Sequence, residues 1–276
     1  MSGTSQAAAD IRTHFEELTD PRRREPTYPL LNLVVMTLCA VVCGADDFVA
    51  IARWARTKQD WLAKFLDMST GVPSHDRFHA VLAALRPREF EQCLLNWITA
   101  LHEITDGQIV AIDGKTLRRS DDAASSKAAI HMVSAWATAN HIRLGQVVVD
   151  AKSHEITAKI LDGGADYCRA VKQNQPRLDH EIEAHFEERI ETDVAEAVRG
   201  HGGIENSLHW QLDVTFGEDQ CRVRQGHADA NLSILRRTAL TLLKNEPTAK
   251  VGIKNKRLTA AWDETYLEQV LFNSQL

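Results

Sequence analysis

Apolar residues in the first hundred positions recur with the spacing of helices. The longest apolar run, residues 30–43, is followed by Gly44. A membrane span needs about 20 apolar residues, so a run of this length is typical of a buried central helix. Further helices are predicted near 48–54 and 61–66, over 75–85 behind an N-cap at Ser74, and over 90–102. The pattern therefore predicts a compact helical domain over residues 1–103.

The pattern changes at Asp106-Gly107, where short apolar runs replace the helical spacing. Three consecutive strands, which suggest a meander, are predicted at 108–113, 130–137 and 143–150. A fourth strand at 166–172 would follow a crossover long enough for parallel pairing. Helical segments are predicted at 156–161, 176–198 and, with amphipathic character, 232–243. The pattern after Asp106-Gly107 is therefore one of strands and helices, unlike the helical first hundred residues.

Composition narrows the class of protein. The chain has 276 residues, 44% of them hydrophobic and 25% charged, which is typical of a soluble globular protein. Lys and Arg number 32 against 38 Asp and Glu, so a histone-like basic protein is excluded. Binding to nucleic acid needs only a local basic face. Basic clusters that could supply such a face, or could be ordinary solvated surface, occur at 22–24, 118–119, 236–237 and within 244–257.

The cysteines and the N-terminal segment indicate the cellular compartment in which the protein is expected. Five cysteines without a CxxC pair support neither a zinc cluster nor a disulfide framework. The N-terminal segment lacks a basic stretch leading into an apolar run, so no signal peptide is expected. We expect a cytoplasmic protein with reduced thiols.

The segment from Asp113 to Arg118, Asp-Gly-Lys-Thr-Leu-Arg, is the first candidate for chemistry. A carboxylate at the end of a strand can hold a divalent metal at the sheet edge, with Lys115 and Arg118 placed for phosphates. A nucleotide-binding loop is disfavoured because six residues separate Gly107 from Gly114, where that motif has four. A strand-end turn with a solvated aspartate is the plain alternative.

Glu205 is the second candidate, in a segment predicted to be helical. A lone helical glutamate is usually just solvated, but His209, Asp213, Arg222 and Arg224 follow it closely. By contrast, the histidines in His-Asp-Arg-Phe-His at 75–79 lack the glutamate of the HExxH zinc motif. Two surface histidines are the better interpretation of that segment.

Several long segments carry a family resemblance. They include DPRRREPTYPLLNLVVMTLCAVVCGADDF, AIDGKTLRRS, GGADYCRAVKQNQP and GIENSLHWQLDVTFGEDQCRVRQGHADANLSILRRTALTLLK. These segments closely resemble the H-repeat-associated (ISAs-one type) insertion-sequence transposases of the DDE group. The resemblance implies a helical DNA-binding domain at 1–103 and a mixed-sheet, RNase H-like catalytic domain at 104–276. The fold class expected is therefore α + α/β.

The resemblance also implies a reaction and its residues. Transposases of this group cut and join DNA with carboxylates that hold divalent ions, usually Mg²⁺, with Mn²⁺ as a substitute. Asp113 matches the first acid and Glu205 the third, so both are expected to be catalytic and metal-binding.

The partners follow from the same resemblance. The expected partner is DNA, at the ends of the element and at the target, in a nucleoid-associated, cytoplasmic protein without a membrane. A homo-oligomer is a further option. The residues expected to contact DNA are Lys115, Arg118, Arg119, Arg222 and Arg224.

The family has a second catalytic acid between the first and the third, and no residue of this sequence matches it. The segments at 155–158 and 159–164 abut here, whereas the family has a helix and an acid-bearing strand between them. A second gap falls near 189–192, so the chain is expected to be an internally shortened transposase. Asp150, after the apolar run Val147–Val149, is a candidate substitute. The alternatives to an active enzyme are a non-catalytic DNA-binding remnant, an inhibitor of a full-length transposase, or a chain that folds poorly.

Overall fold

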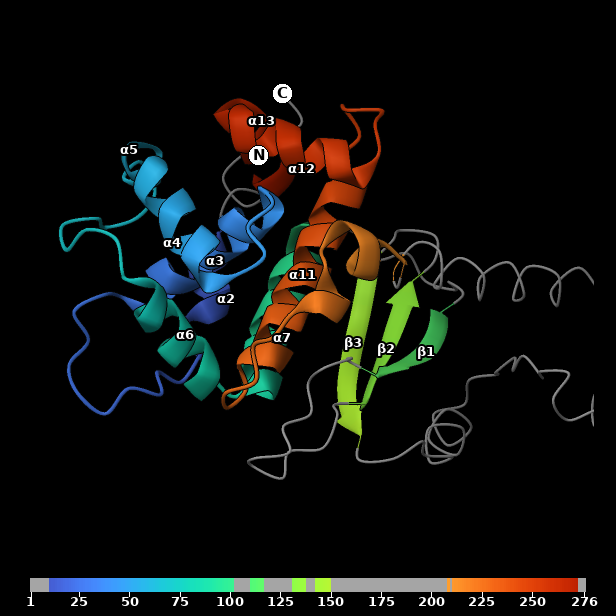
Figure 1. Cartoon of the computed structure of the whole chain (residues 1–276), viewed down its shortest axis with the longest axis horizontal. Coiled ribbons are helices and arrows are strands. Elements are labelled where there is room, and N and C mark those ends of the chain that lie inside the picture. The colour runs from blue at the N-terminus through green and yellow to red at the C-terminus, as the bar shows by residue number, and fades with distance from the viewer. Residues whose placement is uncertain are drawn as a thin grey trace, which may run out of the picture.

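The computed structural model describes residues 10–101, 110–116, 131–137, 142–149, 208 and 210–272. The N-terminal helices are α2 (Ile11–Phe15), α3 (Leu30–Val42), α4 (Phe48–Thr57), α5 (Gln59–Leu62), α6 (His75–Ala84) and α7 (Pro87–Leu101). The C-terminal elements are the π-helix η2 (Gln211–Thr215), the 3-10 helix η3 (Glu218–Gln220), α11 (Ala228–Asn245), α12 (Ile253–Trp262) and α13 (Glu264–Phe272). The described part is thus mainly helical, with a small sheet at one side (Figure 1).

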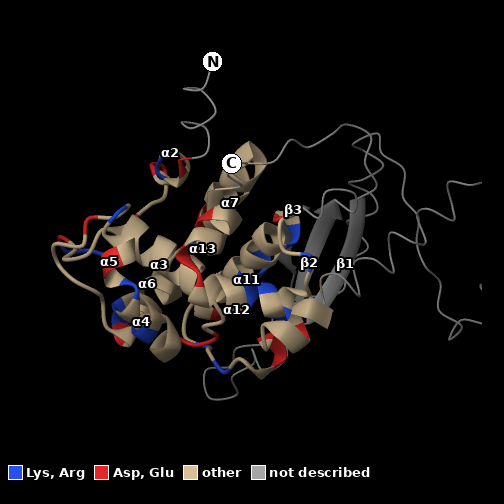
Figure 2. Ribbon diagram, turned by 90° about the horizontal axis from the view of Figure 1, so that it is seen from above, with Lys and Arg blue, Asp and Glu red and all other residues tan. Residues whose placement is uncertain are grey.

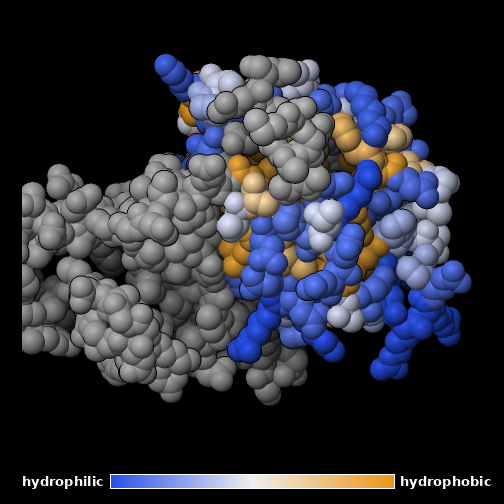
Figure 3. Space-filling model, turned by 180° about the vertical axis from the view of Figure 1, so that it is seen from behind, coloured by the Kyte–Doolittle hydropathy of each residue, from blue (hydrophilic) through white to orange (hydrophobic). Residues whose placement is uncertain are grey.

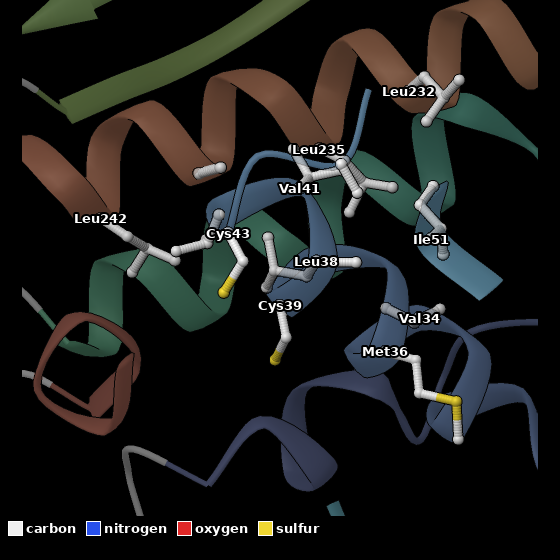
Figure 4. Packing of buried hydrophobic residues seen from close by; sticks show 14 of the residues in the cluster. Val34, Met36, Leu38, Cys39, Val41, Cys43, Ile51, Leu232, Leu235 and Leu242 are labelled. Atoms are coloured by element: carbon white, nitrogen blue, oxygen red, sulfur yellow. The ribbon is translucent and has the colours of Figure 1, made fainter. Parts of the chain in front are cut away.

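Helix α3 is the buried centre of the N-terminal helices and confirms the prediction for residues 30–43. It begins after Pro29 and ends before Gly44, whose φ of 98° suits a glycine after a helix. Nearly the whole length from Asn32 to Val42 is buried, because neighbouring helices cover the apolar run on several sides. In Figure 4, Val41 points toward Leu235 of α11.

The other predicted N-terminal helices are present with small shifts at their ends. Ser74 has the extended backbone of an N-cap residue before α6. Pro87 both follows the end of α6 and occupies the first position of α7, where its fixed φ is accommodated. As a result α7 starts earlier than the predicted residue 90.

The C-terminal helices complete the same hydrophobic core. Helix α11 packs on α3, α6 and α7, and α12 and α13 pack on α11 (Figure 1). One cluster of buried residues therefore joins segments on both sides of the predicted boundary at 103/104, which itself stays a prediction. Helices α12 and α13 were not predicted. The helical spacing of Tyr266, Leu267, Val270 and Leu271, all now buried, was the available signal.

Helix α11 corrects the prediction of an amphipathic helix at 232–243. Every residue from Ala228 to Leu243 is buried, including Arg236 and Arg237. The reason is that other elements surround it: α3, α6 and α7 pack on it together with α12, α13 and η2. The arginines therefore do not form the solvated basic face that the sequence suggested.

The sheet is an antiparallel meander, as the three consecutive strands predicted. Its strands are β1 (Val110–Thr116), β2 (His131–Ala137) and β3 (Ile142–Val149), in the order β1-β2-β3. A register shift between Ala135 and Trp136 interrupts the pairing of β2 with β3. Strand β3 lies against α7 and α11, and β1 is the strand farthest from them (Figure 1). The predicted fourth strand at 166–172, and with it the mixed RNase H-like sheet, lies outside the described residues.

The surface of the described part is mostly polar. Figure 3 shows hydrophilic side chains over much of one face, with hydrophobic residues between them. Among the described residues, no helix combines the length and apolar character that a membrane crossing requires.

Candidate functional site

Asp113 lies in the middle of strand β1. It pairs with Ser134 of β2, and Ser134 pairs with Gln146 of β3. The sequence predicted that the strand would end at Asp113 and turn at Gly114. That prediction was wrong, because Gly114 to Thr116 continue the ladder opposite Val133 to His131. The Gly-Lys-Thr segment is therefore part of a strand, which also excludes a nucleotide-binding loop at this position.

Lys115 follows Asp113 at a distance of two positions in the same strand. Because alternate positions of a strand fall on opposite faces of the sheet, positions 113 and 115 belong to one face. Among the three described strands, β1 has a partner on one side only. The backbone thus brings an acidic and a basic position together on the outermost of the three described strands.

The other predicted partners of Asp113 fall outside the described residues. These are Glu205, Arg118, Arg119 and the substitute acid Asp150. The meeting of Asp113 and Glu205 in one site stays a prediction. Within the described ranges, no group of three or more His, Cys, Asp or Glu side chains is placed to hold a metal ion.

Arg222 and Arg224 lie between η3 and α11, in a segment that is fastened to α6. Arg222 is exposed and Arg224 is half-buried. The backbone N–H of His227 donates to the carbonyl oxygen of Ala83 over 2.9 Å. Gly226 has a φ of 57°, and a Cβ there would lie 2.3 Å from the same oxygen. Sequence analysis did not single out Gly226, for which a glycine just before a helix start was the available signal.

Arg237 is buried in the core, where it pairs with an acidic side chain and does not face a ligand. Its Nη1 contacts Glu218 Oε1 at 2.9 Å, and the two side chains are 0% and 3% exposed. Ser233 also donates to Glu218 Oε1, over 2.7 Å. A buried charge needs such partners, because leaving water without them is costly. The neighbouring Arg236 donates to the carbonyl oxygen of Asp46 over 3.2 Å.

Arg257 is a second buried cation, at the end of the basic run 244–257. Its Nη2 donates to the carbonyl of Val41 over 3.0 Å and to Asp46 Oδ1 over 2.8 Å. Its Nη1 donates to the carbonyl of Thr215, and its guanidinium lies 4.1 Å from the centre of the Phe216 ring. Figure 2 shows basic residues within α11 and α12 in the helical body. Arg236, Arg237 and Arg257 are therefore structural, which corrects the prediction that they could track phosphates. In the predicted cluster at 244–257, Lys256 is also buried, whereas Lys250 and Lys254 are exposed.

Glu246 forms the third internal charge cluster, in the connection after α11. Lys256 Nζ lies 3.3 Å from its Oε2, and Tyr266 donates to the same oxygen over 2.7 Å. Burial of Glu246 works against ionisation, but hydrogen bonds from Thr248 and Tyr266 outweigh it and lower the pKa of Glu246 to about 2. Burial and the bond to Glu246 together raise the pKa of Tyr266 well above its ordinary value. The carboxylate is thus held ionised by the fold.

The buried thiols and His79 take part in packing. Cys39 and Cys43 are buried, and burial raises the pKa of Cys43 to about 12, so its thiol stays protonated at neutral pH. The His79 ring packs 5.0 Å from the Phe48 ring, and His75 Nε2 lies 3.3 Å from Asp76 Oδ1. The His75 side chain is 52% exposed, as the interpretation of a surface histidine predicted, whereas His79 is half-buried.

A family model matches the N-terminal helices. Its description is DDE_Tnp_1-associated, and it covers residues 12–98, which include α3 to α6 entirely and most of α7. No solved structure is significantly similar to this chain.

Three curated relatives match most of the chain. The "Putative transposase YncI" of Escherichia coli O157:H7 is 31% identical over 348 aligned positions, which cover 88% of this chain and 89% of that protein. The "H repeat-associated putative transposase YhhI" of E. coli K12 is 28% identical over 372 positions, with 96% and 98% covered. The "H repeat-associated putative transposase YbfD" of the same strain is 31% identical over 238 positions, with 74% and 94% covered.

The two long alignments also show that this chain is internally shortened. They extend over 348 and 372 positions, whereas the chain has 276 residues. The relatives must therefore contain internal segments without a counterpart here, as the predicted deletions require. With 31% identity to YncI and to YbfD over 89% and 94% of their lengths, the chain belongs to the family of H repeat-associated transposases.

Proposed function

We propose that this protein binds the ends of an insertion sequence and cleaves and transfers DNA strands there, with Asp113 and Glu205 as catalytic acids. The observation that carries the proposal is the position of Asp113 in the middle of β1, the first strand of an antiparallel meander. Hydrogen bonding along β1 fixes the backbone on which the carboxylate is mounted, and a catalytic group needs such a rigid support. The names of the curated relatives support DNA as the partner.

The donor set fits a divalent cation. Asp113 and Glu205 offer carboxylate oxygens, which are the ligands that Mg²⁺ and Mn²⁺ prefer. Bound there, such an ion would supply charge stabilisation at a phosphate and activation of a water or hydroxyl group.

The basic residues supply the complementary charge for DNA. Lys115 shares the strand of Asp113, and Arg118 and Arg119 follow it in sequence. Arg222 and Arg224 precede α11. Contacts from such side chains to phosphate oxygens position a duplex without regard to its sequence. They would bind DNA locally although the whole chain carries a net charge of −6.

A nicking assay tests the catalytic proposal. Supercoiled plasmid that carries the ends of the element is incubated with protein and Mg²⁺ or Mn²⁺, with EDTA as a blank. Nicking by the wild type, lost to background in Asp113→Asn and in Glu205→Gln, is the expected result. The matched controls are Asp60→Asn and Glu25→Gln, which neutralise exposed acids. Nicking that survives in either catalytic variant would overturn the assignment of that acid.

A second function is favoured by the internal shortening of the chain. The alignments exceed its length, and the family resemblance implies that the segment with the middle acid is among those missing. A two-metal site that loses a carboxylate loses ligands to at least one ion. A protein that binds element ends, fails to nick them and slows a full-length relative in the same reaction would be a DNA-binding remnant that acts as an inhibitor. Nicking by the wild type that depends on Asp150 would instead show that this residue replaces the missing acid.

A further inference from the structure

Two segments far apart in sequence are fixed together at one end of the helical body. His227 N–H donates to Ala83 O over 2.9 Å, and Asn231 Nδ2 donates to the carbonyl oxygens of Leu82 and Leu85 over 2.7 and 3.0 Å. Asn231 is fully buried, so these bonds are shielded from water. The start of α11 is thereby fastened to the end of α6 (Figure 1). We call this contact the α6–α11 junction.

Four arginines flank the junction. Arg86 directly follows Leu85, and Arg88 lies in the first turn of α7. Arg224 and Arg222 precede Gly226 by two and four positions, which is at most about 14 Å of extended chain. Arg88 and Arg222 are exposed, the Arg86 side chain is 70% exposed and Arg224 is half-buried. Arginines from both halves of the sequence therefore lie within a few positions of one fixed contact.

The acids near the junction are buried or paired. Glu89 Oε1 accepts from Arg86 Nη1 over 2.6 Å, and this bond holds the pKa of Glu89 below its ordinary value. Asp229 is buried and accepts from the backbone N–H of Ala230. Glu218 is buried against Arg237, and the half-buried Asp219 also has an interaction partner. Because Arg86 is itself paired with Glu89, the exposed positive charge at the junction comes mainly from Arg88 and Arg222, within the described part of the chain.

We infer that the α6–α11 junction is a binding surface for the DNA sugar-phosphate backbone, formed by Arg86 and Arg88 together with Arg222 and Arg224. The inference rests on the proposed function, and it adds N-terminal arginines to the predicted DNA contacts. Arginine suits this role because its planar fork can donate two parallel hydrogen bonds to a phosphate. Since α6 and α11 are locked together, the four groups would hold the duplex as one rigid surface.

Fluorescence anisotropy with a labelled duplex from the element end tests the surface. The test variant is Arg88→Gln with Arg222→Gln, because both side chains are exposed. The matched control is Arg53→Gln with Arg56→Gln, which removes two exposed arginines from α4. The test variant is expected to bind at least about 10-fold more weakly at 0.1 M salt, with a slope of log K against log salt smaller by about two. The control is expected to bind like the wild type, and circular dichroism melts verify that all three proteins fold.

Each other outcome has a definite meaning. If the wild type binds DNA and the test variant binds equally well, the surface is wrong while the proposed function stands. If the control loses as much affinity as the test variant, the effect is one of total charge and the surface is again wrong. If the wild type does not bind DNA at all, the surface and the proposed function both fail. The same measurement is repeated with labelled polyglutamate as a second probe. If the wild type binds polyglutamate, and the test variant loses that binding but retains DNA binding, the junction binds an acidic protein and the proposed DNA surface is wrong.

Discussion

Arg257 Nη2 lies 2.8 Å from Asp46 Oδ1, although 211 positions separate the two residues in the sequence. The same guanidinium donates to the carbonyl oxygens of Val41 and Thr215 and rests on the ring of Phe216. A single side chain therefore joins the end of α3, the π-helix η2 and helix α12. The C-terminal helices are bound to the N-terminal helices by directed polar contacts as well as by apolar packing.

Replacing Arg257 should destabilise the protein strongly. Arg257→Met keeps roughly the length of the side chain but removes the donor to the Thr215 carbonyl oxygen, one of the two donors to the Val41 carbonyl oxygen and the ion pair with Asp46, so we expect a loss of about 2–4 kcal/mol in the free energy of unfolding. Arg257→Lys should recover part of this loss, because one ammonium can replace some of the donors. Urea unfolding followed by tryptophan fluorescence and far-UV circular dichroism measures both. The control Arg53→Met, at an exposed position, should stay within about 0.5 kcal/mol of wild type. Equal stability of the two Met variants would show that Arg257 does not join the helices.

The contrast between α3 and α11 shows what the sequence could and could not predict. The apolar run before Gly44 predicted α3 to within one residue at its end, because an uninterrupted apolar helix can only be buried. Helix α11 contains Arg236 and Arg237, which local periodicity assigns to solvent. Their burial depends on Glu218 and on Asp46, whose positions only the tertiary structure determines. Spacing along one helix carries no information about such partners.

The candidate site was likewise predicted from the sequence only in part. Local pattern found the strand that contains Asp113 but misplaced its end, since Gly114 suggested a turn and cross-strand pairing with Val133 decided otherwise. The junction beside Arg86 and Arg222 could not be predicted, because it depends on a contact between Gly226 and Ala83. The catalytic role of Glu205 was predicted from the family resemblance, because the local sequence showed only that polar residues lie near it.

Gly226 should tolerate substitution less well than Gly217. The two glycines have nearly equal φ values, 57° and 59°, so alanine meets the same backbone strain at both, about 1 kcal/mol. Only at Gly226 would the new Cβ lie 2.3 Å from the Ala83 carbonyl oxygen, whereas nothing lies within 4 Å of a Cβ at Gly217. Gly226→Ala should therefore cost about 1–3 kcal/mol more than Gly217→Ala in urea unfolding. Similar losses for the two variants would mean that the 221–227 segment does not rest on α6.

Glu246 should make the stability of the fold depend on acid pH. Its pKa is lowered from 4.5 to about 2 in the folded protein, so its stabilising contribution is complete above pH 4.5 and is lost as the pH falls toward 2. Glu246→Gln should be less stable than wild type at neutral pH, because the ion pair with Lys256 is gone. The difference between the two proteins should then shrink by up to about 3 kcal/mol between pH 4.5 and 2, since the wild type alone loses a charge there.

Urea midpoints measured for both proteins at intervals between pH 7 and 2 give this difference directly. Glu25→Gln, which removes an exposed carboxylate, serves as the matched control and should follow the wild-type curve throughout. A gap between wild type and Glu246→Gln that stays constant through the acid range would mean that Glu246 ionises as it does in an unfolded chain. The hydrogen bonds from Thr248 and Tyr266 would then not hold its charge, and the connection from α11 to α12 would owe its geometry to Lys256 and to packing alone.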